Sequence, residues 1–231
     1  MTKELNNLFS LEGKVIVITG AAGLLGQKHA EAIAAYGGNP ILLDLSEDAV
    51  EVMANKLNKQ YAVKSVGFAV DITDESQIEN NVVNLIDLYG RIDGLVNNAA
   101  NNPKVEECED KNFSRLENFS LDVWNQDIAV GLTGAFLCAK HYGNEISKNP
   151  EGGSIVNISS LASKRGSANN SVYCASKFGT NGLTQALAKE LGPGGIRVNA
   201  VCPVYVEPPG LLEGLVDQAA PPRGEDPAKY L

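Results

Sequence analysis

A tyrosine and a lysine stand four positions apart in the stretch SVYCASKFG, residues 171–179. In a helix this spacing places Tyr173 and Lys177 on neighbouring turns of one face. A cation beside a phenol favours the phenolate, so the pair has the chemistry of a general base whose pKa lies below the ordinary value near 10. Many such pairs merely line a solvated helix face, however, and the pair by itself is a weak indication of function.

A second stretch has the chemistry to hold phosphate. TGAAGLLG follows the apolar run VIVIT and places Gly20, Gly23 and Gly26 around the start of a helix expected from about Leu24. Glycine lets the backbone approach a pyrophosphate, and the free amides of a helix amino terminus bind its charge. This order of strand, glycine turn and helix predicts a dinucleotide site, although a plain turn explains the glycine spacing about equally well.

Asp44 ends the next apolar run, 18 positions beyond Gly26. This is close to the offset of about 20 residues at which an acid binds the ribose of a dinucleotide. A carboxylate there accepts hydrogen bonds from ribose hydroxyls and repels a 2′-phosphate by roughly 4 kcal/mol at about 4 Å. No arginine accompanies the glycine loop or Asp44, so we expect NAD(H) rather than NADP(H). The alternative is that Asp44 caps the helix that starts near Ser46.

The apolar pattern of the sequence predicts the strands and helices that carry these residues. Six short apolar runs bounded by turn residues predict strands at 15–19, 40–44, 65–70, 93–97, 154–159 and 197–202. Helical segments alternate with them, several opened by a capping Ser, Thr or Asp, at about 24–36, 46–58, 74–89, 120–148 and 173–192. The alternation predicts a single doubly wound, Rossmann-like α/β domain over residues 1–231, with a mostly parallel sheet and helices on both of its faces.

The composition excludes several classes of function. A net charge of −9 without a basic stripe argues against nucleic acid as a partner. The four cysteines are widely spaced and form no CxxC pair, so we expect reduced thiols, no disulfide framework and no metal site. The amino terminus has no apolar signal core and no apolar run reaches membrane-spanning length, which predicts a cytoplasmic protein without a membrane partner.

With these motifs in place, residues 10–203 resemble the classical short-chain dehydrogenase/reductase family. The matching motifs stand in the order of the family: TGAAGLLG, Asp44, DITD at 71–74, NNAA at 97–100, NISS at 157–160, YCASK at 173–177 and RVNAVCP at 197–203. Ser160 stands 13 positions before Tyr173, the offset of the catalytic serine of the family. Seven matches in order are far more specific than any one of them.

The resemblance implies a role for each residue of the catalytic set. Tyr173 is expected to be the general acid/base, Lys177 the cation that favours its phenolate and reaches the nicotinamide ribose, and Ser160 a hydrogen-bond donor to the reacting oxygen. Hydride is then expected to move between the nicotinamide of NAD(H) and the carbinol or carbonyl carbon of an alcohol or ketone, such as a sugar or polyol derivative.

The cofactor contacts expected by position lie at the ends of the strands and in the glycine loop. Asp71 and Ile72 are expected against the adenine, and Asn98 and Ala99 against the adenosine half or the sheet beneath it. The remaining contacts are expected from Gly20, Gly23, Leu24, Leu25, Gly26, Asp44, Tyr173, Lys177 and Pro203.

The chain departs from the pattern of the family at several positions. Leu24 replaces a glycine, and the resulting TGxxGxxG spacing is closer to the extended branch of the family, which includes epimerases and dehydratases. Ala100 replaces the last glycine of NNAG, and Val204 replaces the glycine after Pro203. Gly131 stands where the family has an asparagine that holds a water of the proton relay and kinks its helix; glycine has no side chain for the water but permits the kink.

Two other functions therefore stay open: a relative that binds cofactor with impaired catalysis, and a lyase or epimerase that uses bound NAD transiently. No Asp-Gly-Gly signature of a seventh strand follows, so we expect six strands where the family normally has seven. The Pro-rich segment 203–231 and the segment 101–122 are expected to form the substrate rim. Glycines within the helix at 173–192 suggest close packing, from which we expect a homodimer or homotetramer.

Overall fold

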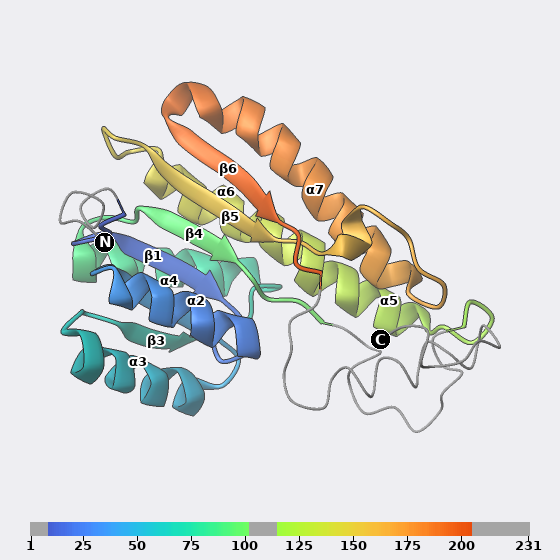
Figure 1. Cartoon of the computed structure of the whole chain (residues 1–231), viewed down its shortest axis with the longest axis horizontal. Coiled ribbons are helices and arrows are strands. Elements are labelled where there is room, and N and C mark those ends of the chain that lie inside the picture. The colour runs from blue at the N-terminus through green and yellow to red at the C-terminus, as the bar shows by residue number, and fades with distance from the viewer. Residues whose placement is uncertain (1–8, 102–114, 205–231) are drawn as a thin grey trace.

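Within the described residues, the sheet is built from six parallel strands. The structure is a computed structural model and describes residues 9–101 and 115–204. The strand order is β3-β2-β1-β4-β5-β6 and every neighbouring pair is parallel. The arrowheads of the strands that Figure 1 labels point the same way. This confirms the predicted doubly wound sheet. The strands are β1 (Val15–Thr19), β2 (Asn39–Asp44), β3 (Val66–Ala69), β4 (Gly94–Asn97), β5 (Gly153–Ile158) and β6 (Ile196–Val201).

Helices connect the strands and cover both faces of the sheet, as predicted. The α-helices are α2 (Leu24–Ala35), α3 (Glu47–Tyr61), α4 (Glu75–Tyr89), α5 (Leu121–Ile128), α6 (Ala135–Ile146) and α7 (Ser171–Leu191). The described residues also form three shorter helical segments, η1 (Ala129–Gly134), η2 (Leu161–Ser163) and η3 (Gly192–Gly194). None of the helices in the described part of the chain has the length and apolar character that crossing a bilayer requires.

Two apolar cores separate the layers. On one face, residues of α2 and α3 such as Ile33 and Val50 pack against Ile18 and Leu42 of the sheet. On the other face, α4, α6 and α7 share a larger core, in which Tyr142 is fully buried. Strands that are covered on both faces must be apolar on both, which is why they read as continuous apolar runs in the sequence.

Local sequence signals set most of the helix boundaries. The side chains of Ser46, Asp74 and Ser120 accept hydrogen bonds from backbone amides at the starts of α3, α4 and α5, which confirms the predicted caps. Gly90 ends α4 in the left-handed region, with φ of 72°.

The predicted helix at 120–148 is divided in the structure. Its central segment, η1, is a π-helix with Gly131 inside it. A Cβ on Gly131 would lie 2.3 Å from the Ser176 hydroxyl oxygen of α7, so the backbones of the two helical segments approach closely here. A π-helical segment inside an α-helix commonly marks a functional site, and the change in helix type agrees with the predicted kink.

The order of the strands places a binding edge between β1 and β4. The chain moves outward from β1 to β2 and β3, and then crosses to β4 on the other side of β1. In an open parallel sheet this reversal leaves a crevice at the carboxyl ends of the strands, where ligands bind. Most of the two predicted substrate-rim segments, residues 102–114 and 205–231, lies outside the described residues.

Candidate active site

Lys177 and Tyr173 lie one turn apart near the start of α7. The Lys177 Nζ donates a 2.8 Å hydrogen bond to the carbonyl of Ile158, at the carboxyl end of β5. The same Nζ lies 5.6 Å from the centre of the Tyr173 ring. Only 3% of Lys177 is exposed, which is rare for a lysine and indicates that the site uses its ammonium group.

Ser160 joins this pair from the loop after β5. Its backbone is extended and its hydroxyl caps η2 by accepting a 3.1 Å hydrogen bond from the Ala162 amide. It is also hydrogen-bonded to the Tyr173 phenol. The structure thus brings together the three residues predicted from the sequence to be catalytic, although they come from two elements.

Burial has the largest effect on the pKa values of Lys177 and Tyr173. Burial lowers the pKa of Lys177 from its ordinary value of 10.5 to about 8. Burial raises the pKa of Tyr173, and the hydrogen bond from Ser160 offsets part of this rise. The sequence suggested that the cation would lower the phenol pKa, whereas the pKa of Tyr173 is raised in the structure, because the effect of burial is larger than that of the hydrogen bond that stabilises the phenolate.

Asp127, on the last turn of α5, is a site residue that sequence reasoning missed. It is 1% exposed, and its charge acts on both Tyr173 and Lys177, raising the pKa of each. Helix α5 packs directly on α7, which brings this carboxylate to the pair. The only signal in the sequence is an acidic residue inside the helix expected at 120–148, and such a residue more often faces water.

The glycine turn is held in shape by contacts that only glycine permits. Gly20 has φ of 63°, and a Cβ on it would lie 2.8 Å from the Cα of Ala99. A Cβ on Gly26 would lie 2.2 Å from the Gly20 carbonyl oxygen. Gly20 and Gly26 are therefore required by the packing of the turn against α2 and the end of β4. Gly23 is the exposed residue that precedes α2.

The amino terminus of α2 opens towards the carboxyl edge of the sheet. The helix begins at Leu24, so the amides of Leu24, Leu25 and Gly26 belong to its first turn, which has no carbonyl partners within the helix. Leu24 is 50% exposed and does not block the turn. With leucine in place of the usual glycine, the first turn thus keeps the amides and the dipole that can bind a phosphate.

Asp44 stands at the end of β2 beside this turn. One carboxylate oxygen accepts a 2.9 Å hydrogen bond from the Ala22 amide, and the other accepts one of 2.9 Å from Leu45. The cap of α3 is the Ser46 side chain, so the alternative that Asp44 serves as this cap is wrong. Asp44 is partly exposed next to the glycine turn, where a ribose-binding acid would have to lie.

The adenine-side residues have structural partners of their own. The Asp71 carboxylate accepts hydrogen bonds from both the amide and the hydroxyl of Thr73. Ile72 is 7% exposed, and its side chain packs against Gly134 of η1. Their contacts with adenine stay predictions.

Hydrogen bonds join Asn98 and Ala99 to the end of β1 and to the glycine turn. The Asn98 side-chain amide donates 3.0 Å hydrogen bonds to the carbonyls of Thr19 and Gly20. The amides of Asn98 and Ala99 each donate to the Thr19 hydroxyl, also at 3.0 Å. These bonds join the end of β4 to the end of β1 and to the glycine turn. Contact of Asn98 and Ala99 with the adenosine half of a cofactor stays a prediction.

Pro203 follows β6 and lies next to the loop that carries Ser160. Its carbonyl accepts a 2.9 Å hydrogen bond from the Leu161 amide. Val204, which replaces the usual glycine, is 62% exposed. Both residues are therefore at the carboxyl edge, beside the catalytic set.

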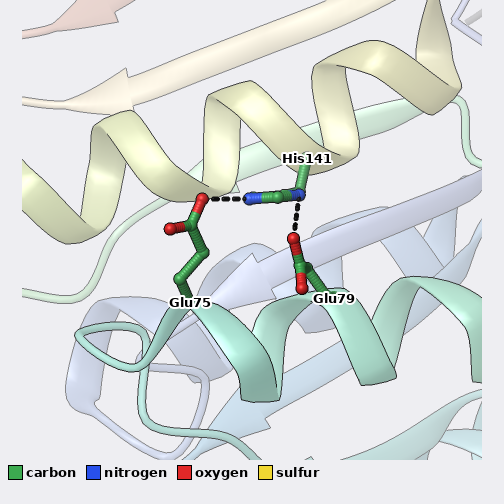
Figure 2. A group of neighbouring side chains, drawn as sticks. All are labelled: Glu75, Glu79 and His141. Atoms are coloured by element: carbon green, nitrogen blue, oxygen red, sulfur yellow. Dashed lines mark hydrogen bonds and ion pairs between the residues drawn. The ribbon is translucent and has the colours of Figure 1, made fainter.

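A separate group of titratable side chains joins α4 to α6. Glu75, Glu79 and His141 could each offer an atom to a metal ion (Figure 2). The His141 Nε2 lies 2.7 Å from Glu75, whereas its Nδ1 lies 3.9 Å from Glu79, so the two carboxylates flank opposite sides of the ring. Lys140 also contacts Glu75 at 2.6 Å. The group is therefore explained as an ion-pair network between the two helices.

Comparison with known proteins agrees with this geometry. The sequence profile of the family described as short chain dehydrogenase matches residues 14–218. The trans-4-hydroxycyclohexanecarboxylate dehydrogenase of Sinomonas cyclohexanicum is 37% identical over 211 residues, which cover 87% of this chain and 76% of that protein. The D-threitol dehydrogenase of Mycolicibacterium smegmatis is 34% identical, over 86% of this chain and 72% of that protein.

A solved structure extends the similarity to three dimensions. The crystal structure of an NAD+-bound xylitol dehydrogenase superposes with a TM-score of 0.81 at 30% identity. The match covers 91% of this chain and 77% of the other.

Proposed function

The chain belongs to the short-chain dehydrogenase family of oxidoreductases, and on that premise we propose that it is an NAD(H)-dependent dehydrogenase of an alcohol or polyol. The observation that carries the proposal is the convergence of Ser160, Tyr173 and Lys177 at the carboxyl end of β5, on the edge that also holds the glycine turn. A general acid/base, a polar group for the reacting oxygen and a buried cation are thereby assembled beside a dinucleotide-type turn.

The residues present fit a dinucleotide. The first turn of α2 offers amides to a pyrophosphate, and the partly exposed Asp44 carboxylate offers acceptors to ribose hydroxyls. The negative charge of Asp44 disfavours a 2′-phosphate, which supports NAD(H) over NADP(H). When bound, the nicotinamide supplies or accepts the hydride.

The chain itself manages the proton and the charge. In oxidation, Tyr173 removes the hydroxyl proton of the substrate at its phenol oxygen; in reduction, it returns that proton to the carbonyl oxygen. Ser160, hydrogen-bonded to the phenol, stabilises charge that develops on the same oxygen. The Lys177 ammonium provides the nearby positive charge that favours ionised tyrosine.

The substrate class is proposed from the relatives. The names of three similar proteins denote dehydrogenases of a hydroxycyclohexane carboxylate, threitol and xylitol, all of which carry secondary or primary carbinols. We therefore propose a polyol or a cyclic hydroxy compound as the substrate of this chain.

Binding and turnover test the proposal in sequence. Fluorescence titration with NADH and NADPH is expected to show saturable binding that favours NADH. A panel of polyols and cyclic alcohols with NAD+ is then expected to yield NADH, followed by its absorbance. Binding without turnover on any member would instead support the cofactor-binding relative, and a copurifying cofactor that does not exchange would support the lyase or epimerase.

We also propose self-association through α6 and α7. Close packing within the chain explains Gly179, because a Cβ there would lie 2.8 Å from Leu132. A Cβ on Gly182, in contrast, would meet no described atom of another segment within 4 Å. Phe136 and Phe178 are 46% and 47% exposed on these two helices, and large apolar side chains at a helix surface favour a partner. Light scattering coupled to size-exclusion chromatography would show a dimer or tetramer, and a monomer at all concentrations would contradict this.

A further inference from the structure

A carboxylate lies buried beside the two groups to which the proposed function assigns proton transfer. Asp127 is 1% exposed, and both of its carboxylate oxygens are buried. Its neighbours Asn125 and Gln126, on the same short helix, are exposed. Removing a carboxylate from water is costly unless nearby charge or hydrogen bonding stabilises it. The location of α5 at the surface does not by itself explain why the Asp127 carboxylate is buried.

The packing of two helices sets where Asp127 lies along α7. Because β4, β5 and β6 are parallel, the segment from α5 to α6 and the helix α7 both return against the strands and run in the same direction. The Thr180 hydroxyl lies 3.3 Å from the Gly131 carbonyl, and the Ser176 hydroxyl oxygen lies 2.3 Å from where a Gly131 Cβ would be. Gly131 thus faces the turn of α7 between Ser176 and Thr180.

Asp127 lies one helical turn before Gly131. In two helices that run in the same direction, it must face the preceding turn of α7, which carries Tyr173 and leads to Lys177. The electrostatics agree with this placement, since the Asp127 charge acts on both residues. Burial lowers the pKa of Lys177 and Asp127 opposes this; burial raises the pKa of Tyr173 and Asp127 adds to the rise.

We infer that Asp127 is a positioning residue of this site: its buried carboxylate keeps Lys177 as an ammonium ion beside Tyr173 and thereby sets the pH range in which the tyrosine exchanges its proton. The inference rests on the proposed dehydrogenase function for its catalytic consequence. The effect of the Asp127 charge on Lys177 and Tyr173 depends only on the packing of α5 against α7.

Among the residues that the structure describes, two cysteines are the other titratable groups that act on Tyr173 and Lys177. Cys174 acts on Tyr173 from the same helix, and Cys202 acts on Lys177 from the loop after β6. An Asp127→Asn substitution leaves both thiols in place. Any change in the pH response is then due to the carboxylate.

The first test is the pH profile of kcat/KM for alcohol oxidation. Loss of the negative charge lowers the pKa of the general base, Tyr173, and of the cation, Lys177. Both limbs of the profile in Asp127→Asn are therefore expected to move to lower pH, by about one unit. Asp127→Glu is expected to restore the wild-type limbs. Asp122→Asn, an exposed acid on the first turn of the same helix, is the matched control.

A second readout needs neither turnover nor cofactor. The ¹³Cε chemical shift of Lys177 is followed between about pH 6 and about pH 10. The signal is assigned to Lys177 because the Lys177→Met variant lacks it. In the wild type its midpoint is expected at about 8. In Asp127→Asn the midpoint is expected at lower pH, and Asp127→Ser offers a second neutral variant if the first does not fold.

The two readouts separate this inference from the proposed function. An unchanged Lys177 midpoint, or a profile lowered in height with unmoved limbs, would overturn the role of Asp127 even in an active enzyme. A lowered midpoint in a protein that turns over no substrate would uphold the effect of Asp127 on Lys177 and count against the dehydrogenase function.

Discussion

The Lys177 ammonium nitrogen lies 5.6 Å from the centre of the Tyr173 ring and donates a hydrogen bond to the end of β5. The lysine is therefore held between the sheet and the phenol, out of contact with bulk water. Its burial costs free energy as long as it carries a proton, and this cost is measurable as a dependence of stability on pH.

Lys177 is expected to make the cofactor-free protein more stable as the pH rises. Between its folded pKa of about 8 and its ordinary value of 10.5, the unfolded chain binds the proton and the folded chain does not. The free energy of unfolding, relative to Lys177→Met, should then rise through this window by up to about 3 kcal/mol and stay constant below it. Urea denaturation at several pH values measures this. Lys189→Met, an exposed lysine near the end of α7, should show no such dependence.

Replacing the phenol should remove turnover and leave cofactor binding intact. Tyr173→Phe keeps the ring, so NADH affinity should stay within a few-fold, while the rate falls by roughly a hundredfold or more because the general acid/base is lost. Steady-state assays and fluorescence titration measure the two effects. Tyr36→Phe, at the far end of α2, is the control. A Tyr173→Phe protein with half the wild-type rate would refute the assigned role.

Asp44 is expected to decide between the two nicotinamide cofactors. Asp44→Asn removes the charge and retains an oxygen that can accept the hydrogen bond from Ala22. The preference for NADH over NADPH should narrow by at least about tenfold, which corresponds to roughly 1.4 kcal/mol. Titration with both cofactors measures the ratio, with Asp48→Asn on the exposed first turn of α3 as the control. An unchanged ratio would place the ribose site elsewhere.

Gly131 and Ser176 are expected to be coupled in stability. In a helix, Gly→Ala ordinarily gains up to about 1 kcal/mol, but a Cβ at Gly131 would meet the Ser176 hydroxyl at 2.3 Å. The gain should therefore appear only when Ser176→Ala removes that hydroxyl, with a coupling of about 1 kcal/mol in a double-mutant cycle. Chemical denaturation of the four proteins measures it, and additive effects would show that the two residues do not meet.

Local patterns along the chain were sufficient to predict the helices and strands and most of their ends. Apolar runs predicted all six strands to within one or two residues, because strands buried on both faces must be apolar on both. Caps such as Ser46 and Asp74 were predictable because a side chain bonds the backbone within a few residues of itself. The glycine turn and the spacing of Ser160, Tyr173 and Lys177 were equally visible, since each depends on local order along the chain.

The groups that lie opposite these local features depend on how the helices pack and could not be predicted from local patterns. The π-helical segment that divides the predicted helix at 120–148 depends on how closely Gly131 approaches Ser176, a contact between distant parts of the chain. The buried Asp127, and the net rise in the Tyr173 pKa, arise from the packing of α5 on α7 and from the exclusion of water between them. Electrostatic energies depend on distance and burial in space, and neither quantity is encoded in the spacing of residues along a chain.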